Sequence, residues 1–221
     1  LWDARHKKGC RFTNTLHGTS NTCERDLNQF PIFVRNNGAL SFINKVLDKC
    51  KGTLNTQVSG QTPFGFVSTY RGTANPEQDT TAVELKSSGA TTYVARADIK
   101  KNAAWTDMYK VVFSKATCEH AGTPDRNGQY RVLSALAILQ PQCVCTQSYL
   151  VAGAYPTAQE AENLLTYLKT KFVRYLILQT ITSQDLSPEK FMFVPLQDFT
   201  AASDINWSAA IEEIDSQLYE K

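Results

Sequence analysis

The most regular pattern of apolar and polar positions in the sequence runs over residues 158–179. Apolar side chains recur there every three or four positions, which is the spacing of one face of a helix. Thr157 precedes the pattern and Glu160 follows three residues later, a spacing typical of a capping box. The pattern therefore predicts one long helix, whose apolar face is wide enough to pack against a sheet.

The rest of the chain is divided into shorter runs by turn residues. Runs rich in Thr, Val, Tyr and Phe predict strands at residues 31–35, 64–70, 81–86, 92–95, 109–114, 132–138, 148–151 and 191–196. Apolar residues at helical spacing predict a helix over residues 39–50. The acidic segment 209–221 predicts a final helix. A hairpin is expected at residues 87–89, and residues 1–30 should form a loop or an irregular strand pair.

These elements predict an α+β fold, in which a mostly antiparallel, twisted sheet packs on the long helix and short helices flank it. No internal repeat and no linker divides the sequence. We therefore expect one domain over residues 1–221, composed of a polar N-terminal segment with a helix (1–57), a strand-rich part (58–157) and a C-terminal part (158–221).

The net charge of +2 hides an uneven distribution of charged residues. From Asp185 onward there are eight acidic and two basic residues, which leaves 21 basic and 13 acidic residues before it. A basic body with an acidic tail is compatible with a nucleic-acid partner, although most mildly basic surfaces bind nothing. No apolar run reaches the roughly 18 residues needed to span a bilayer, so we expect a cytoplasmic protein without a membrane partner.

Motifs for catalysis or metal binding are weak in this sequence. The six cysteines are irregularly spaced, which favours free thiols. Cys143 and Cys145 form a C-x-C pair, whereas a zinc site would want a C-x2-C or an H-x3-H pair, and the sequence has neither. The nearest catalytic pattern is Asp79 with Glu84-x-Lys86, residue types that a Mg²⁺-dependent nuclease uses to hold its metal and orient water. Asp79 lies only five residues before Glu84, and a solvated charge pair explains the same pattern, so we assign no catalytic residue.

Basic residues beside aromatic or polar ones form three clusters that could contact nucleic acid. Phosphates are held by Lys and Arg, whereas base edges are contacted by Arg, Asn, Gln, Ser and Thr. A solvated surface is the alternative for each cluster. The candidate DNA-binding residues, including one in the polar loop at 119–128, are Thr69, Arg71, Arg96, Lys100, Lys101, Arg126, Lys169 and Lys171.

Several segments resemble a known bacterial family in the same order along the chain. They are C-T-Q-S-Y-L-V-A-G (145–153), N-L-L-T-Y-L-K-T-K-F-V-R-Y-L (163–176), F-V-P-L-Q-D-F (193–199), S-D-I-N-W-S (203–208) and I-D-S-Q-L-Y-E-K (214–221). Upstream, K-K-G-C-R-F-T (7–13), P-F-G-F (63–66) and Y-V-A-R-A-D-I (93–99) are also similar. The chain resembles the C-terminal part of Type II restriction-modification proteins with an adenine-N6 DNA methyltransferase, some of which are fused to an endonuclease.

This resemblance implies a target-recognition domain, which recognises the DNA sequence for a catalytic domain upstream in the same polypeptide. That catalytic domain carries an N-P-P-[YF] motif and an S-adenosylmethionine site, and this sequence lacks both. The chain thus resembles an excised specificity domain with no cofactor of its own. The expected partners are double-stranded DNA and the upstream methyltransferase domain.

Within that interpretation, the chemistry of the side chains suggests roles that the resemblance does not assign. Lys100, Lys101, Lys169 and Lys171 would contact phosphates, and the loops at 69–71 and 119–127 would contact bases. Two alternatives remain open at this point. The chain could be the Mg²⁺-dependent nuclease described above, or an interaction module whose acidic final helix binds a partner subunit.

Overall fold

The computed structural model describes residues 9–16, 18–76, 81–117, 124, 126–128 and 130–221. The strands are β1 (Cys10–Leu16), β2 (Thr19–Arg25), β3 (Ala82–Lys86), β4 (Thr91–Ala95), β5 (Tyr109–Ser114), β6 (Ala137–Leu139), β7 (Cys143–Cys145) and β8 (Tyr149–Tyr155). The α-helices are α1 (Leu40–Lys49), α2 (Ala158–Lys169), α3 (Lys171–Leu178) and α4 (Ile211–Glu220). Short 3₁₀ helices span Asn37–Ala39, Leu54–Thr56, Arg96–Asp98, Ala103–Asp107 and Pro188–Phe191. In this part of the chain, each helix is too short or too polar to cross a membrane.

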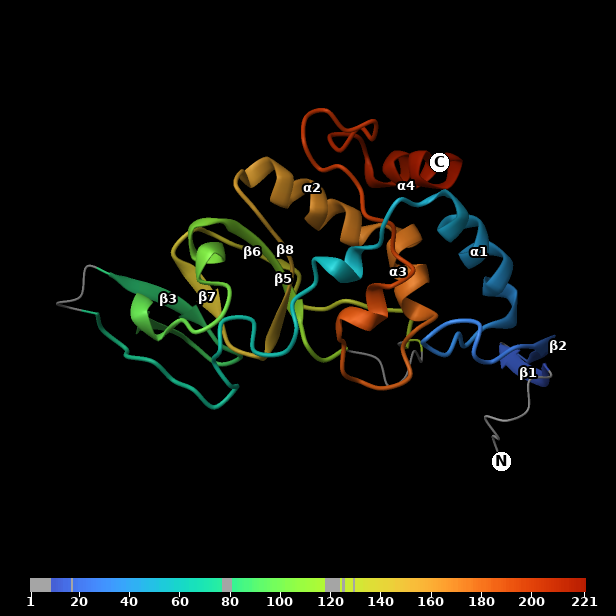
Figure 1. The fold of residues 1–221 in the computed structure, drawn as a ribbon, viewed down its shortest axis with the longest axis horizontal. Helices are drawn as coiled ribbons and strands as arrows, with labels where there is room; N and C mark the ends of the chain where they lie inside the picture. Colours follow the sequence, from blue (N-terminus) through green and yellow to red (C-terminus); the bar gives the residue numbers. More distant parts are fainter. Residues whose placement is uncertain (1–8, 17, 77–80, 118–123, 125, 129) are drawn as a thin grey trace.

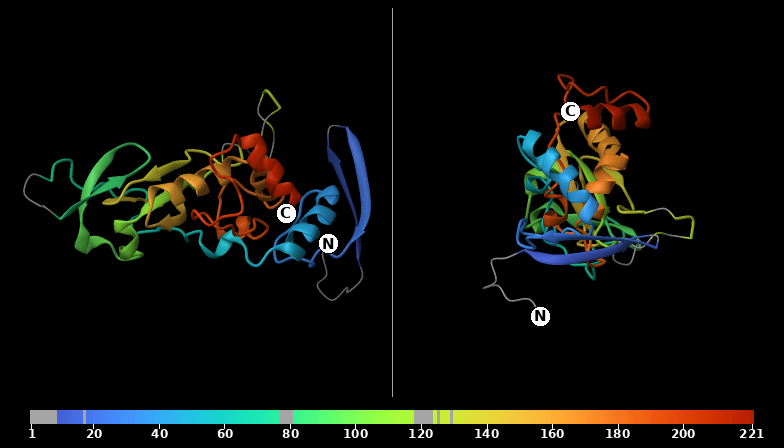
Figure 2. Two further views of the ribbon diagram at one scale, coloured as in Figure 1. Left: turned by 90° about the horizontal axis from the view of Figure 1, so that it is seen from above. Right: turned by 90° about the vertical axis from the view of Figure 1, so that its right-hand side faces the viewer.

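The predicted α+β fold is confirmed. The described strands form an isolated β1–β2 ribbon, a sheet in the order β4-β3-β7 and a sheet in the order β6-β5-β8. Neighbouring strands are antiparallel, apart from the parallel pair β3 and β7. Figures 1 and 2 show the sheet β4-β3-β7 toward one end of the molecule and the β1–β2 ribbon at the other.

The sheet β6-β5-β8 contributes to two hydrophobic cores, because successive side chains of a strand point to opposite faces. Val111 and Phe113 of β5, with Leu150 of β8, belong to a core that they share with the helices. Val112 and Val151 belong to a second core, which they share with the sheet β4-β3-β7. We call the helical side, with α1 to α4, the larger region and the side built on β3, β4 and β7 the smaller region (Figure 1).

The predicted long helix is wrong in one respect, because it is two helices. The capping box at Thr157 and Glu160 is present and starts α2 as expected. The helix then breaks at Thr170, which is extended (φ −63°, ψ 152°) and whose hydroxyl accepts a hydrogen bond from the Val173 N–H at the start of α3. Asp215 of α4 accepts two more hydrogen bonds, from the N–H groups of Lys171 (3.0 Å) and Phe172 (2.9 Å). These acceptors satisfy the free N–H groups of a new helix start, which makes the break stable.

Several predicted strands are confirmed, and others are replaced by irregular structure. The prediction at 81–86 and 92–95 corresponds to the hairpin β3–β4, and the one at 109–114 matches β5. Residues 64–70 and 191–196 form turns and loops, and most of 132–138 also lies outside a strand. Their apolar side chains are still buried, for example those of Phe64 and Phe193. These apolar runs therefore contribute to the core from irregular segments.

The β1–β2 ribbon is a regular antiparallel pair, where the sequence suggested a loop or an irregular strand pair. Asn37 anchors it by donating hydrogen bonds from its side-chain amide to the carbonyls of Phe12 (3.0 Å) and Asn21 (2.9 Å). Arg25 lies over the rings of Phe12 and Phe33, and donates to the Val34 carbonyl. The base of the ribbon is therefore fixed to the larger region.

Candidate nucleic-acid interface

Two loops of the smaller region pack against each other and carry most of the predicted DNA-binding residues. The Lys100 N–H donates to the Phe64 carbonyl (3.3 Å), and the Asn102 side chain donates to the Pro63 carbonyl (2.8 Å). The buried Phe64 ring meets the Trp105 ring edge to face at 6.4 Å between centroids. We call residues 62–73 and 96–102 the basic loop pair, since these contacts hold them as one unit.

Three exposed cations of the basic loop pair, Arg71, Lys100 and Lys101, are not neutralised by carboxylates in the described structure. The Lys101 ammonium donates to the Thr62 hydroxyl (3.0 Å), the Lys100 ammonium to the Ala97 carbonyl (3.0 Å) and the Arg71 guanidinium to the Ser68 carbonyl (2.8 Å). All these acceptors are neutral. The loops therefore present positive charge in a fixed position, with Thr69 exposed beside Arg71.

Arg96 differs from the other three cations, because its charge is already paired. Its guanidinium donates to both carboxylate oxygens of Asp107, at 2.9 Å for the Nη1–Oδ1 pair, and to the Gln142 side chain at 3.3 Å. Gln142 in turn donates to Asp107 at 2.6 Å. The hydrogen bond from Arg96 lowers the pKa of Asp107 below its ordinary value, with a further contribution from Gln142. Arg96 is thus bound within the chain by Asp107 and Gln142 and is less available to a ligand.

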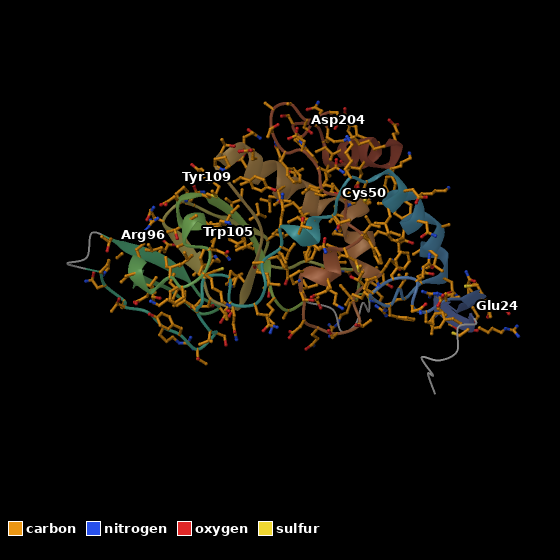
Figure 3. All side chains as sticks on the ribbon, in the orientation of Figure 1. Glu24, Cys50, Arg96, Trp105, Tyr109 and Asp204 are labelled. Atoms are coloured by element: carbon orange, nitrogen blue, oxygen red, sulfur yellow. The ribbon has the colours of Figure 1, made fainter. Side chains whose placement is uncertain are left out.

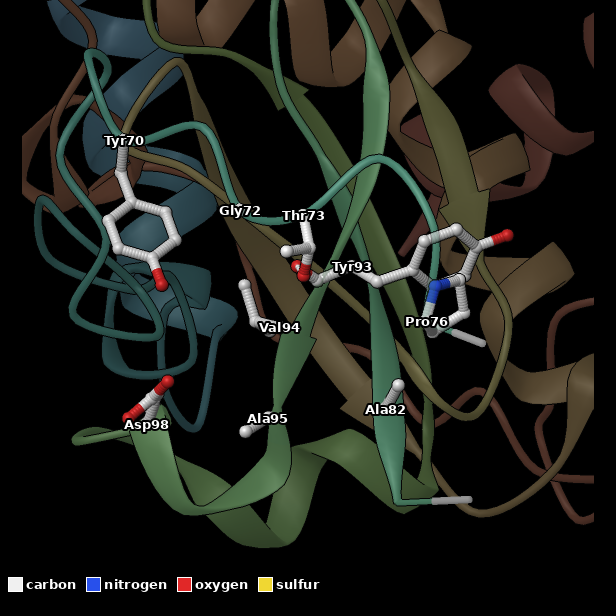
Figure 4. A pocket seen from close by; sticks show the side chains of 9 residues that line it. All are labelled: Tyr70, Gly72, Thr73, Pro76, Ala82, Tyr93, Val94, Ala95 and Asp98. Carbon is white, nitrogen blue, oxygen red and sulfur yellow. Dashed lines mark hydrogen bonds between the residues drawn. The ribbon is translucent and has the colours of Figure 1, made fainter. Parts of the chain in front are cut away.

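A pocket of about 460 Å³ opens between the basic loop pair and β4 (Figure 4). Its lining residues are Tyr70, Gly72, Thr73, Pro76, Ala82, Tyr93, Val94, Ala95 and Asp98. Thr73 and Tyr93 fix one wall by exchanging backbone hydrogen bonds of 2.8 and 2.9 Å. Gly72 is required there, because its φ is +52° and a Cβ atom would lie 2.4 Å from the Tyr93 carbonyl oxygen. Figure 4 shows the Tyr70 hydroxyl and the Asp98 carboxylate pointing into the same part of the pocket.

The remaining predicted residues lie elsewhere. Lys169 and Lys171 are exposed where α2 meets α3, in the larger region beside α4 (Figure 1). Arg126 is exposed in a turn of the loop at 119–128, of which residues 119–123 and 125 fall outside the described residues. Figure 3 shows Arg96 and Trp105 at the end of the molecule away from Glu24. The structure thus gathers the candidates at 69–101 and separates them from those on the helices.

The residues of the two alternative functions lie outside the basic loop pair. Asp79 falls outside the described residues. Glu84 accepts a hydrogen bond from the Cys143 thiol (3.4 Å), and the Lys86 ammonium lies 5.6 Å from the Tyr149 ring centroid. No group of three or more His, Cys, Asp or Glu side chains suited to a metal ion occurs within the described ranges. Glu84 and Lys86 therefore take part in packing β3 on its neighbours.

The acidic final helix α4 is part of the larger core. Its side chains Ile214 and Leu218 are buried there, and Asp215 contacts the start of α3. Tyr219 adds aromatic contacts with Phe42 and Phe172, at 5.9 and 5.3 Å between ring centroids. The apolar face of α4 is therefore already occupied within this chain.

Sequence reasoning did not identify Asp98, Tyr93 or Asp107 as parts of the site. Asp98 lies between Arg96 and Lys100 in the sequence, and a carboxylate inside a basic segment was the one available signal. Tyr93 was assigned to a strand and to a segment of family resemblance, with no role in binding. The pairing of Asp107 with Arg96 depends on how the segment before β5 folds back on the end of β4, which no local pattern indicates.

Comparisons with known proteins leave the family of this chain open. No protein-family model matches it, and no curated protein sequence matches it either. Its function must therefore be inferred from the basic loop pair and the adjoining pocket.

Proposed function

We propose that this chain is a double-stranded DNA recognition domain that holds a duplex against the basic loop pair. The observation that carries this proposal is the set of exposed, unneutralised cations Arg71, Lys100 and Lys101 on two loops fixed to each other. Cations held in place on loops and strand ends suit a phosphate backbone, because little conformational entropy is lost when they bind. The exposed Thr69 lies two residues before Arg71 and is proposed to contact base edges.

The resemblance to adenine-N6 methyltransferases supports a role for this domain within a larger enzyme. In that role the domain fixes the position of its DNA site, so that an upstream catalytic domain with S-adenosylmethionine can act on an extruded adenine. The helices α2 and α3 then serve as the scaffold on which the central sheet and, through it, the basic loop pair are mounted. Lys169 and Lys171 are assigned to that scaffold and not to the proposed DNA-binding surface.

Salt dependence provides the first test. Each phosphate contact releases counterions, so the affinity for a 30-base-pair duplex should fall steeply between about 50 and 200 mM salt. The triple variant Arg71→Ala, Lys100→Ala, Lys101→Ala should bind at least about tenfold more weakly at low salt, with a salt slope reduced by up to about three contacts. Fluorescence anisotropy of a labelled duplex measures both quantities.

A matched control removes the same charge from the larger region. Lys45, Lys169 and Lys171 are exposed there, and their combined replacement by alanine also removes three positive charges. This variant should retain most of the affinity and most of the salt slope. Equal losses in the two triple variants, or an affinity of the wild-type protein that does not change with salt, would contradict the proposal.

A further inference from the structure

The pocket beside the basic loop pair is lined by a carboxylate, that of Asp98. A site that bound only phosphate would not be expected to contain a carboxylate. Asp98 lies in the segment that also carries Lys100 and Lys101, and its side chain has no hydrogen-bond partner among the described residues. An ionised carboxylate only accepts hydrogen bonds, and it repels phosphate. Its presence among cations indicates a ligand that brings hydrogen-bond donors as well as negative charge.

The walls of the pocket suit a flat ring. Tyr70, Val94 and Ala95 line its part near Asp98, and the Tyr93 ring lies on the other side beside Pro76 (Figure 4). The Tyr70 ring is supported from behind by the buried Phe66, with 4.7 Å between the ring centroids. Stacking of a base on such an aromatic ring contributes about 1–3 kcal/mol and is common where proteins bind unpaired nucleic acid.

The volume of the pocket suits a single nucleotide. A cavity of about 460 Å³ lies within the size range of small-ligand sites. Arg71 adjoins the lining residues Tyr70 and Gly72, and Lys100 lies two residues after Asp98. The two loops that line the pocket thus carry two cations that can offset the charge of a phosphate.

The donor pattern of the bases decides which of them a carboxylate prefers. An unpaired guanine presents two adjacent donors, N1–H and the N2 amino group, which match the two oxygens of a carboxylate. Adenine and cytosine each present an amino group next to a ring nitrogen that accepts hydrogen bonds, and this nitrogen repels the second oxygen. Thymine presents one N–H between two carbonyl oxygens.

We propose that this pocket binds a single unstacked guanine, with the carboxylate of Asp98 accepting from its N1–H and amino group and the Tyr70 ring stacking on it. The inference rests on the proposed function, because the loops that line the pocket are those proposed to contact DNA. Extruding a paired base costs a few kcal/mol, so a guanine that is already unpaired binds more readily.

Duplexes with a one-nucleotide bulge test the pocket directly. One 20-base-pair duplex is prepared with a bulged guanine, adenine, cytosine, thymine or hypoxanthine, and the affinities are compared by competition against the perfect duplex. The guanine bulge should bind about tenfold more tightly than the other three natural bases. Hypoxanthine, which lacks the amino group, should fall between guanine and the rest.

Variants assign that preference to side chains. Asp98→Asn should abolish the preference for guanine, and Tyr70→Ala should weaken binding of every bulge, whereas Tyr70→Phe should retain it because the ring is kept. Glu213→Gln removes the same charge from an exposed position on α4 and should leave the preference unchanged. Circular dichroism of each variant confirms that it is folded.

The outcomes separate this inference from the proposed function. If duplexes bind with the expected salt dependence and the guanine bulge has no advantage, or keeps it in Asp98→Asn, the pocket assignment is overturned and the proposed function stands. If no duplex binds, titration with dGMP against dAMP tests the pocket alone. Binding of dGMP that depends on Asp98 would then assign the pocket to a free nucleotide, and its absence would overturn the inference.

Discussion

The larger and the smaller region place their charged side chains in different surroundings. In the larger region, two buried charged groups are bonded within the chain: Asp215 accepts from two backbone N–H groups of α3, and the Lys190 ammonium donates to the Thr180 carbonyl at 2.9 Å. In the smaller region, Arg71, Lys100 and Lys101 donate to neutral oxygen atoms, and the exposed Asp98 side chain has no hydrogen-bond partner in the described structure.

This difference suggests that the two regions have different roles. Charged groups that are bonded internally stabilise the fold, because an unpaired buried charge would be costly. Charged groups held in place but left unpaired cost stability or contribute little to it, and they are common at functional sites. The larger region is therefore interpreted as scaffold and the smaller region as the ligand-binding part, and each prediction below tests that separation.

The largest expected effect comes from a matched pair of core substitutions. Leu168 on α2 and Leu85 on β3 are both 0% exposed, one in each core. Leu168→Ala and Leu85→Ala should each lower the free energy of unfolding by about 2–5 kcal/mol. Because β5 and β8 belong to both cores, both variants should shift one cooperative transition in urea, measured by fluorescence and circular dichroism together. Two separate transitions, with Leu85→Ala moving only one, would show that the regions unfold independently.

The next effect concerns the break between α2 and α3. Asp215→Ala removes the acceptor of two backbone hydrogen bonds and a negative charge at the start of α3. Hydrogen bonds to a charged group contribute about 1.5–3 kcal/mol, so the variant should lose about 2 kcal/mol of stability in urea. Asp215→Asn, which keeps one acceptor oxygen, should lose less. DNA affinity should not change in either variant at a temperature where both are folded, and a parallel loss of affinity would contradict the separation of the two regions.

Lys110 lies at the boundary between the regions and gives a pH-dependent effect. It is fully buried on β5, and its ammonium donates to the Gln140 carbonyl at 2.8 Å. Burial lowers the pKa of Lys110 from 10.5 to about 8. Between these two values the unfolded chain binds more protons than the folded one, so this group makes stability rise with pH.

The comparison with Lys110→Met isolates this effect. Burial raises the pKa of the Cys143 thiol to about 12, and a raised thiol pKa acts in the opposite direction above about pH 9. Most of that contribution lies above pH 9, outside the range in which the two proteins are compared. The wild-type protein should gain about 1 kcal/mol relative to Lys110→Met between pH 7 and pH 9. A difference that stays constant over this range would mean that Lys110 keeps an ordinary pKa in the folded state.

The elements that could be predicted from the sequence are those fixed by neighbours in the chain. The β3–β4 hairpin, β5 and the capping box at Thr157 depend on local alternation, turn residues and a three-residue spacing. The break at Thr170 could not be predicted, because it is stabilised by Asp215, more than 40 residues away. The strands expected at 64–70 and 191–196 failed for a related reason, since tertiary packing buries their aromatic side chains from turns and loops.

Some residues of the candidate site were likewise expected from the sequence, and others became candidates only from the fold. Arg71, Lys100 and Lys101 were chosen as candidates from side-chain chemistry alone, and the fold places them on two loops that contact each other. Lys169 and Lys171 were equally good candidates at the sequence level, because charge and spacing do not indicate which surface a residue joins. Asp98 became a candidate only once the fold showed a carboxylate lining a pocket without a partner in the described structure.

The smallest expected effect tests whether Arg96 can contact DNA once it is released from Asp107. Asp107→Asn removes the carboxylate that pairs with Arg96 and should free the guanidinium for phosphate. DNA affinity should rise about two- to fivefold at low salt, with a salt slope steeper by up to about one contact. Anisotropy titrations in a double-mutant cycle measure this, because removing a negative charge near DNA also raises affinity without any help from Arg96. In the Arg96→Ala background the gain from Asp107→Asn should therefore shrink to that charge effect, whereas an equal gain in both backgrounds would show that Arg96 does not contact DNA.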